Sequence, residues 1–422
     1  MGCRRRRRRP AHADRGHHDH RRRPHHVGAR HGHQRQEEIE VVDETVFALS
    51  LLLLTYTYLG YPALAWARAA LQPRPPRAWG IEPDVTVVLA VHDEAERITR
   101  RLENLLALEY PRDRLDIVVG SDGSTDGTAD LARAFESHGV SVVAFGSRRG
   151  KPAVLNDLVP KARGAIVVLA DARQRFEPAA LRALVAPFAD PEIGAVSGEL
   201  MLTAGEDGTP VGEGVGFYWR YEKFIRCQES RAASTPGATG AIYAIRRELF
   251  EAIPDDTILD DVLIPLRIVR RGYRVVLEPR ARAWDRAAAT GHQEFTRKVR
   301  TIAGKFQLFT REPWLLSPWH NPLWPQTVSR IALRLLGPVL LVTALGASAR
   351  LAAQPLYAAM LGVQLLFYGA ALGGYLARGA RRRSRWLSVP YVFCLLHCAI
   401  VAGFVRFITG RQRVTWEKAT AR

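Results

Sequence analysis

The sequence predicts an α/β domain built on a mostly parallel sheet and joined to a membrane region of α-helices. Two observations carry this prediction. Between residues 85 and 172, short apolar runs of strand length alternate with segments of helical spacing, which is typical of a parallel sheet covered on both faces. Four longer apolar stretches, one before this region and three after it, are long enough to cross a bilayer.

Residues 1–36 are the most basic part of the chain. They hold 12 arginines against two aspartates, and so supply +10 of the formal net charge of +18, with eight of the 13 histidines. Such a segment has almost nothing apolar to bury, so we expect residues 1–44 to form a disordered tail. Two alternatives are a tail that binds anionic lipid or metal, and an upstream start codon that is not the true start. Because the excess charge is concentrated here, the composition does not indicate a nucleic-acid partner.

The first apolar stretch, residues 46–66, has 21 residues without a charge. It is too long, and too far from the N-terminus, for a cleaved signal. We therefore expect a transmembrane helix over 45–67, followed by a Pro-rich linker over 68–84. Three more transmembrane helices are expected within residues 331–410, at about 331–349, 356–377 and 386–408. The four cysteines form no CxxC pair and predict neither a zinc site nor a disulfide framework.

The charges that flank these stretches predict an orientation. The flank before the first stretch is acidic ("EEIEVVDE"), whereas the flank behind it ("ARAALQPRPPR") and the last loop ("ARGARRRSR") are basic. Lysine and arginine in short flanks prefer the cytoplasm. We therefore expect residues 67–330 to be cytoplasmic and the basic C-terminal tail, residues 411–422, to lie outside. The N-terminal arginine run favours the opposite orientation, but it ends well before the membrane.

Carboxylates follow three of the predicted strands. The strands are expected at 85–91, 115–120, 140–146 and 165–172, and the helices between them at 96–108, 128–139 and 151–162. Asp93 and Glu94 follow the first strand, Asp122 the second and Asp171 the fourth. Taken alone, "SDGSTD" around Asp122 favours a capped turn. Ligands of parallel sheets bind at this edge, however, and gathered carboxylates need a metal or a cationic ligand, so the three strand ends together predict a binding site.

Lys151, in "RRGKP", stands beside the same edge and is suited to a phosphate group. The segment is not a nucleotide-binding P-loop, because three residues instead of four separate its glycines. Pro152 also stands where that motif has serine or threonine. A kinase or ATPase is therefore a poor interpretation.

Further candidates lie in the second half of the region. The small residues around Gly240 fit a close approach of the backbone to a ligand. Asp260 and Asp261 begin a predicted helix, where capping alone explains one of them. Arg297 and Arg300 lie off the apolar stripe of a predicted helix, and a solvated helix face explains them equally well.

Together, these segments resemble the membrane-bound family 2 glycosyltransferases that build bacterial polysaccharides. The resemblance rests on the order of "VVLAVHDE", "VVGSDGSTDGT", "GKPAVLN", "LADA", "GATGAIYAIRRELF", "LDDVL" and "RKVRT". It implies a GT-A fold for residues 85–312, an interfacial segment over 313–330 and a place in the bacterial inner membrane, with membrane lipids as partners. It also implies a nucleotide-sugar donor, usually UDP-linked, a divalent metal (Mg²⁺ or Mn²⁺) and inversion at the anomeric carbon.

The resemblance further implies roles for the candidate residues. Asp261 would be the general base and Asp171 would hold the metal. The donor site would consist of Asp93, Glu94, Asp122, Lys151 and Arg300. Candidates on the acceptor side are Gly240, Asp260 and Arg297.

Two motifs depart from the family pattern. The metal motif DxD reads Asp171-Ala172-Arg173, without its second carboxylate, so we expect the metal to bind together with the donor. The motif QxxRW begins at Arg297 and lacks its tryptophan. The resemblance nevertheless implies an inverting glycosyltransferase that acts on a lipid-linked or polysaccharide acceptor. The alternative is a non-catalytic membrane scaffold or regulatory protein that retains the fold.

Overall fold

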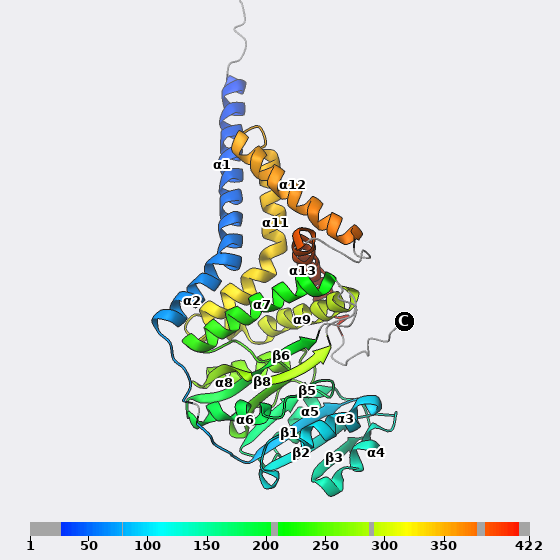
Figure 1. Cartoon of the computed structure of the whole chain (residues 1–422). Helices are drawn as coiled ribbons and strands as arrows, with labels where there is room; N and C mark the ends of the chain where they lie inside the picture. Colours follow the sequence, from blue (N-terminus) through cyan, green and yellow to red (C-terminus); the bar gives the residue numbers. More distant parts are fainter. Residues whose placement is uncertain (1–26, 78, 204–209, 287–290, 378–384, 413–422) are drawn as a thin grey trace, which may run out of the picture.

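The computed structural model describes residues 27–77, 79–203, 210–286, 291–377 and 385–412. A sheet with its covering helices lies at one end of the molecule, and a group of long helices lies at the other (Figure 1). Helices α7 (Pro210–Ala232) and α9 (Gly291–Arg311) lie between the two parts. The predicted tail segments 1–26 and 413–422 and most of the basic loop before the last apolar stretch lie outside the described residues.

The sheet has eight strands in the order β3-β2-β1-β4-β7-β6-β8-β5. Their bounds are Val85–Val91 (β1), Leu115–Asp122 (β2), Val140–Phe145 (β3), Ile166–Ala170 (β4), Arg175–Phe176 (β5), Ile193–Thr203 (β6), Ile242–Arg246 (β7) and Arg274–Arg286 (β8). Strands β1 to β4 are mutually parallel, as is the pair β6 and β8. Strand β7 runs antiparallel to both neighbours, and β5 runs antiparallel to β8. The sheet is therefore mostly parallel, as predicted.

Helices cover both faces of this sheet. Their bounds are Ala95–Leu106 (α3), Thr128–Arg133 (α4), Lys151–Leu158 (α5), Ala180–Val185 (α6) and Asp260–Arg270 (α8), with short turns at Arg112–Arg114 (η2), Glu136–His138 (η3), Ala186–Ala189 (η4) and Arg247–Leu249 (η5). Helices α3, α4 and α6 contribute to one apolar cluster, and α5 and α8 to the other. Every residue of β1 is buried, because alternate side chains enter the two clusters.

Two helices in this region are shorter than predicted. The predicted helix 128–139 is α4 followed by the separate turn η3, which is capped by Gly139 with a φ of 83°. The predicted helix 151–162 ends as α5 at Leu158. In both cases, the chain must turn back early to enter the next strand of the sheet.

Three described helices are long and apolar enough to cross a membrane, namely Trp324–Arg350, Pro355–Leu376 and Trp386–Ile408. They correspond to the three predicted C-terminal spans. The first of them comprises α10 (Trp324–Gln326), η7 (Thr327–Ala332) and α11 (Leu333–Arg350); the others are α12 (Pro355–Leu376) and α13 (Arg385–Ile408). The turn η6 (Pro313–Leu316) precedes them.

The first predicted span, residues 46–66, is helical but is not among those three. It is divided among α1 (Val27–Thr55), η1 (Tyr56–Gly60) and α2 (Tyr61–Leu71). The structure corrects the expected disorder of the tail for residues 27–44, which belong to α1. Tertiary contact explains part of this order, because Asp43 accepts hydrogen bonds from Arg350 of α11 at 2.7 Å.

Helix α9 links the sheet domain to the long helices. The predicted stripe of Phe295, Val299, Ile302 and Phe306 packs against α13. The approach is close, because a Cβ on Gly403 of α13 would lie 2.6 Å from the Ile302 side chain. On the other side, a Cβ on Gly304 of α9 would lie 2.6 Å from the Leu259 side chain, so α9 also contacts the segment just before α8.

Candidate active site

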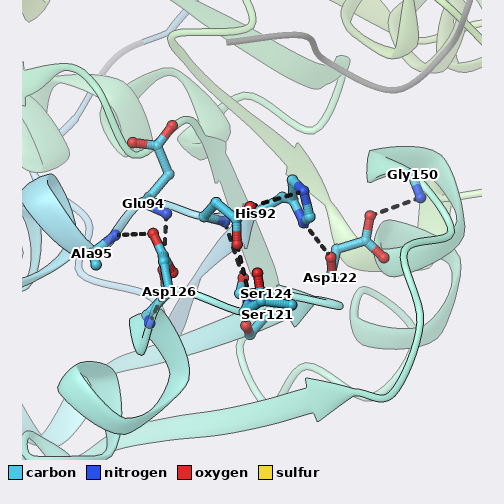
Figure 2. A network of polar contacts seen from close by, with 11 residues as sticks. His92, Glu94, Ala95, Ser121, Asp122, Ser124, Asp126 and Gly150 are labelled. Carbon is cyan, nitrogen blue, oxygen red and sulfur yellow. Dashed lines mark hydrogen bonds and ion pairs between the residues drawn. The ribbon is translucent and has the colours of Figure 1, made fainter.

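A dense network joins the ends of β1 and β2 (Figure 2). The His92 Nδ1 atom donates to the Asp122 carbonyl at 2.7 Å, and the Asp93 amide donates to Ser124 Oγ at 3.1 Å. The Glu94 amide donates to Thr128 Oγ1 at 2.8 Å. Asp93 has a φ of 52°, a conformation that aspartate tolerates better than most residues. These bonds fix the backbone on which the predicted donor-binding residues stand.

The Asp122 carboxylate holds a neighbouring loop. Its Oδ1 accepts from the Arg149 amide, and its Oδ2 accepts from the Gly150 amide, both at 2.7 Å. Gly123 makes this contact possible, because a Cβ there would lie 2.5 Å from the Arg148 backbone nitrogen. Asp122 is buried, so the two amides also provide the hydrogen bonds that a buried carboxylate requires. The loop they hold leads directly into α5 and Lys151.

Lys151 joins the ends of two further elements. Its ammonium group lies 3.1 Å from Asp171 Oδ1, after β4, and 3.1 Å from Asp260 Oδ2, at the start of α8. Burial alone would lower the pKa of Lys151, but Asp171, Asp260 and Asp261 raise it above its usual value. The side chain is therefore a permanent cation among carboxylates. The structure thus brings together Lys151, Asp171 and the adjacent pair Asp260 and Asp261, which come from three separate elements.

Asp261 has the most perturbed carboxylate in this group. Burial, followed by the negative charge of Asp260, raises its pKa to about 6, and Lys151 partly offsets the shift. Its Oδ2 accepts a hydrogen bond from the Gly240 amide at 3.0 Å. A Cβ on Gly240 would come within 3.2 Å of the same oxygen, so glycine permits this approach. A half-buried carboxylate with this pKa can exchange a proton near neutral pH.

Arg173, which replaces the second acidic residue of the DxD motif, is paired with another carboxylate. Its Nε lies 2.9 Å from Asp285 Oδ2, on β8. Gln174 donates to the same oxygen at 3.1 Å. Asp285 is buried, so this pairing also meets the need of a buried charge for a partner.

The carboxylates do not by themselves fit a divalent metal. Within the described ranges, no group of three or more histidine, cysteine, aspartate or glutamate side chains is placed to hold one. One oxygen of Asp171, Oδ1, already pairs with the Lys151 ammonium group. Arg173 occupies the position at which the DxD motif has its second carboxylate. Any metal would therefore need most of its ligands from another molecule.

The two arginines predicted on α9 have different environments. Arg297 is exposed and lies 3.9 Å from Glu294, one turn before it on the same helix. Arg300 is half-buried, on the same helix as the stripe that contacts α13. A place on a solvated helix face therefore fits Arg297 better than Arg300.

Several polar residues of this region escaped the sequence analysis. Asp126 accepts from the Ala95 amide at 3.1 Å, at the start of α3. Arg101 is a buried guanidinium that lies 4.0 Å from the centre of the Phe176 ring. Neither Arg101 nor Asp285 stands in a recognisable motif, so only the fold identifies them. His92 and Asp126, by contrast, lie within the motifs "VVLAVHDE" and "VVGSDGSTDGT", so the sequence does carry a signal for them.

Comparisons with known proteins agree with this geometry. The family model "Glycosyltransferase like family 2" matches residues 83–304. Among curated proteins, a probable glycosyltransferase, YdaM, of Bacillus subtilis is 26% identical over 53% of this chain and 55% of its own length. The poly-beta-1,6-N-acetyl-D-glucosamine synthase of Staphylococcus aureus is 28% identical over 54% of this chain and 56% of its own. The chain therefore spans about half the length of these relatives.

A solved structure extends the similarity to the long helices. It is the mannosyltransferase PcManGT from Pyrobaculum calidifontis, in complex with GDP-Man and Mn²⁺. The match has a TM-score of 0.66 and 26% identity, and covers 87% of this chain and 99% of that one. The sheet domain and the helices beside it are thus similar in arrangement to one known protein.

Proposed function

Because the chain belongs to the glycosyltransferase like family 2, with a GT-A fold, we propose that it transfers a sugar from a nucleotide-sugar donor to an acceptor hydroxyl at a membrane. The observation that best supports this proposal is the cluster of Lys151, Asp171, Asp260 and Asp261. It combines a cation suited to a diphosphate with a carboxylate of near-neutral pKa. Both are needed for glycosyl transfer, and a scaffold protein would need neither.

The proposed reaction is a single displacement with inversion. Asp261 accepts the proton of the acceptor hydroxyl while that oxygen forms a bond to the anomeric carbon of the donor. The bond between that carbon and the diphosphate breaks, and the nucleoside diphosphate leaves with the bonding electrons. Lys151 stabilises the charge that grows on the diphosphate. Arg300 is a proposed second diphosphate contact, and Asp93, Glu94 and Asp122 are proposed to line the nucleoside side.

The remaining site residues are proposed on the acceptor side. Gly240 presents its amide to Asp261, and Asp260 stands one residue away on the same helix start. Arg297 is exposed on α9 and so is open to an acceptor. We assign these three no part in the proton transfer itself.

A divalent metal is proposed to bind only together with the donor. The similar mannosyltransferase is in complex with both GDP-Man and Mn²⁺, whereas the residues that the structure describes here offer Asp171 but no group of three acidic, histidine or cysteine ligands. Calorimetry should detect weak or no Mg²⁺ or Mn²⁺ binding by the protein alone, and clear binding once a nucleoside diphosphate is added. Transfer that persists undiminished in excess chelator would contradict the proposal.

The acceptor is proposed to be lipid-linked or a growing polysaccharide. The Staphylococcus aureus relative is named for a polysaccharide that it synthesises. In this chain, the stripe on α9 packs against the apolar helix α13, so the site lies near that helix. Exposed apolar side chains, Phe217 and Phe224 on α7 and Trp319 in the segment before α10, suit a membrane surface.

The proposed location is the bacterial inner membrane, with the domain 85–312 in the cytoplasm, an interfacial segment at 313–330 and spans at 45–67 and within 331–410. The three apolar helices support membrane association. A reporter that is active only outside the cytoplasm should give signal when fused after Arg422. Signal from a fusion near residue 200 would contradict this orientation.

The central experiment is release of nucleoside diphosphate by the purified protein with a panel of UDP- and GDP-sugars. UDP-sugars are the first candidates, and the panel includes GDP-sugars because the similar structure binds GDP-Man. Release that needs an added lipid-linked or glycan acceptor would support the proposed reaction. Absence of release and of binding with every donor would contradict it.

A further inference from the structure

Arg101 is a buried cation without a full set of partners. It lies on α3 with 2% of its surface exposed, within the apolar cluster that contains Leu102 and Leu105. Its guanidinium stacks on Phe176, and its Nη1 donates to Asn104 at 3.0 Å. Among the residues that the structure describes, its Nε and Nη2 atoms have no hydrogen-bond partner.

This arrangement is costly for folding. A buried charge loses its hydration, and each buried donor without a partner adds to that loss. Stacking on an aromatic ring recovers only part of the cost. An apolar side chain such as methionine would fill the same space more cheaply. The positive charge therefore requires an explanation other than packing.

The position of Arg101 suggests one. Asn104, its hydrogen-bond partner, accepts from the Phe176 amide at 2.8 Å and donates to the Phe176 carbonyl at 2.9 Å. Phe176 belongs to β5, which follows the loop that carries Asp171 and Arg173. Arg101 and Asn104 thus hold the far end of this loop. Burial lowers the pKa of Arg101 to about 9, and the charge of Asp171 partly offsets that shift.

The charges at the rim show why a further cation would help. Lys151 pairs with Asp171 and Asp260 and also feels the charge of Asp261. A diphosphate brought to this rim adds negative charge to a region that is already negative. A buried charge acts through a medium of low polarity, so its effect reaches further than that of an exposed side chain.

We propose that Arg101 is a positioning residue whose buried charge, placed beneath the loop of Asp171, favours binding of the donor diphosphate. This inference rests on the proposed function, because it needs a diphosphate at the rim. Arg101 touches neither donor nor acceptor in this proposal. Its charge offsets the repulsion between the rim carboxylates and the phosphates.

The test compares ligands that differ only in phosphate number. Calorimetry on the full chain in detergent measures binding of uridine, UMP and UDP, and of guanosine, GMP and GDP. We expect Arg101→Met to weaken diphosphate binding about tenfold, monophosphate binding less, and nucleoside binding hardly at all. Arg101→Lys keeps the charge and should restore the ratio of diphosphate to nucleoside affinity to within about threefold of the native ratio.

A matched control is Arg246→Met. Arg246 also lies over an aromatic ring, 5.5 Å from the centre of Phe188, and donates to backbone carbonyls such as that of Ile193. Its loss should lower the melting temperature without changing the ratio of affinities. If Arg101→Met does not fold, the test relies on Arg101→Lys. A tenfold fall in the ratio of diphosphate to nucleoside affinity of this variant would overturn the inference.

Other outcomes are equally clear. Equal weakening of nucleoside, monophosphate and diphosphate by Arg101→Met would show that Arg101 only supports the loop, and would overturn the inference alone. Unchanged affinities would do the same. A native protein that binds no nucleoside diphosphate would contradict the proposed function itself, and the inference with it.

Discussion

The two halves of the candidate site hold their carboxylates in different ways. At the ends of β1 and β2, Asp93 and Asp122 accept hydrogen bonds from backbone amides of neighbouring loops. Around Lys151, by contrast, Asp171 and Asp260 share one ammonium group, and Asp261 has a raised pKa. The first half builds a rigid shape from neutral donors. The second keeps several charges close together, where a ligand or a proton can change the balance.

This difference suggests a division of labour. Backbone amides cost nothing to hold in place once the fold exists, so the half at β1 and β2 suits recognition of a nucleoside. The closely spaced charges around Lys151 suit the two steps in which charge moves, namely transfer of the proton and departure of the diphosphate. Substitutions in the second half should therefore change the rate of transfer or the binding of the diphosphate most, and substitutions in the first half should mainly change shape and stability.

The largest effect is expected for Asp261→Asn. The amide retains the size of the side chain but cannot accept the proton, so turnover should fall at least about a hundredfold while donor binding survives. Rates with saturating donor, together with the donor dissociation constant, measure the two effects. Asp260→Asn is the control and should do less. Equal, mild losses from both substitutions would mean that Asp261 is not the base.

Lys151→Met should mainly weaken donor binding. It removes the ammonium group that faces two carboxylates and leaves their charges uncompensated. A charged hydrogen bond of this kind contributes about 1.5 to 3 kcal/mol, so we expect affinity for the diphosphate to fall roughly tenfold to a hundredfold. Titration with UDP and GDP measures it. Unchanged affinity would separate Lys151 from the diphosphate.

Proton uptake by Asp261 should limit the rate in acid. Because its pKa is raised to about 6, the carboxylate loses its basic form below that pH. Turnover should then fall about tenfold for each further pH unit. A rate that stays level down to pH 5 would contradict the assignment of the base.

The same raised pKa predicts how stability depends on pH. The direction is opposite to that of a salt-bridged carboxylate, whose pKa is lowered in the folded state. The folded state holds this proton more tightly than the unfolded chain, where the usual value is 3.8. The contribution of this proton to the stability of the fold is therefore fully present below pH 3.8. It is lost as the pH rises through about 6. Asp261→Asn should therefore raise the melting temperature at pH 7, and the gain should disappear in acid.

The smallest effect on turnover is expected for Asp122→Asn, in the other half of the site. An asparagine can accept from only one of the two amides of Arg149 and Gly150. The free energy of unfolding should fall by about 1 to 3 kcal/mol, and the loop before Lys151 should exchange its amide hydrogens faster. A loss of turnover as large as that of Asp261→Asn, with an unchanged melting temperature, would contradict the division between the halves.

The sequence by itself determined the architecture and predicted the edge of the sheet at which the candidate site is expected. The apolar runs predicted β1 to β4 correctly, and β1 and β4 are buried along their whole length, as continuous apolar runs indicate. The carboxyl edge followed from the rule that parallel strands end on one side. The apolar stripe on α9 and the three C-terminal apolar helices were also predicted from spacing and length.

Only the tertiary structure decided which charges meet. Lys151, Asp171 and Asp260 lie on three separate elements, and no local pattern gives the 3.1 Å distances that join them. The partner of Arg173 is equally remote, since Asp285 lies on β8, more than a hundred residues later. Arg101 reads as one more charge on a helix until the fold buries it under β5. Local spacing sets the period of a helix or strand, but burial and ion pairing depend on packing between segments that are distant in the chain.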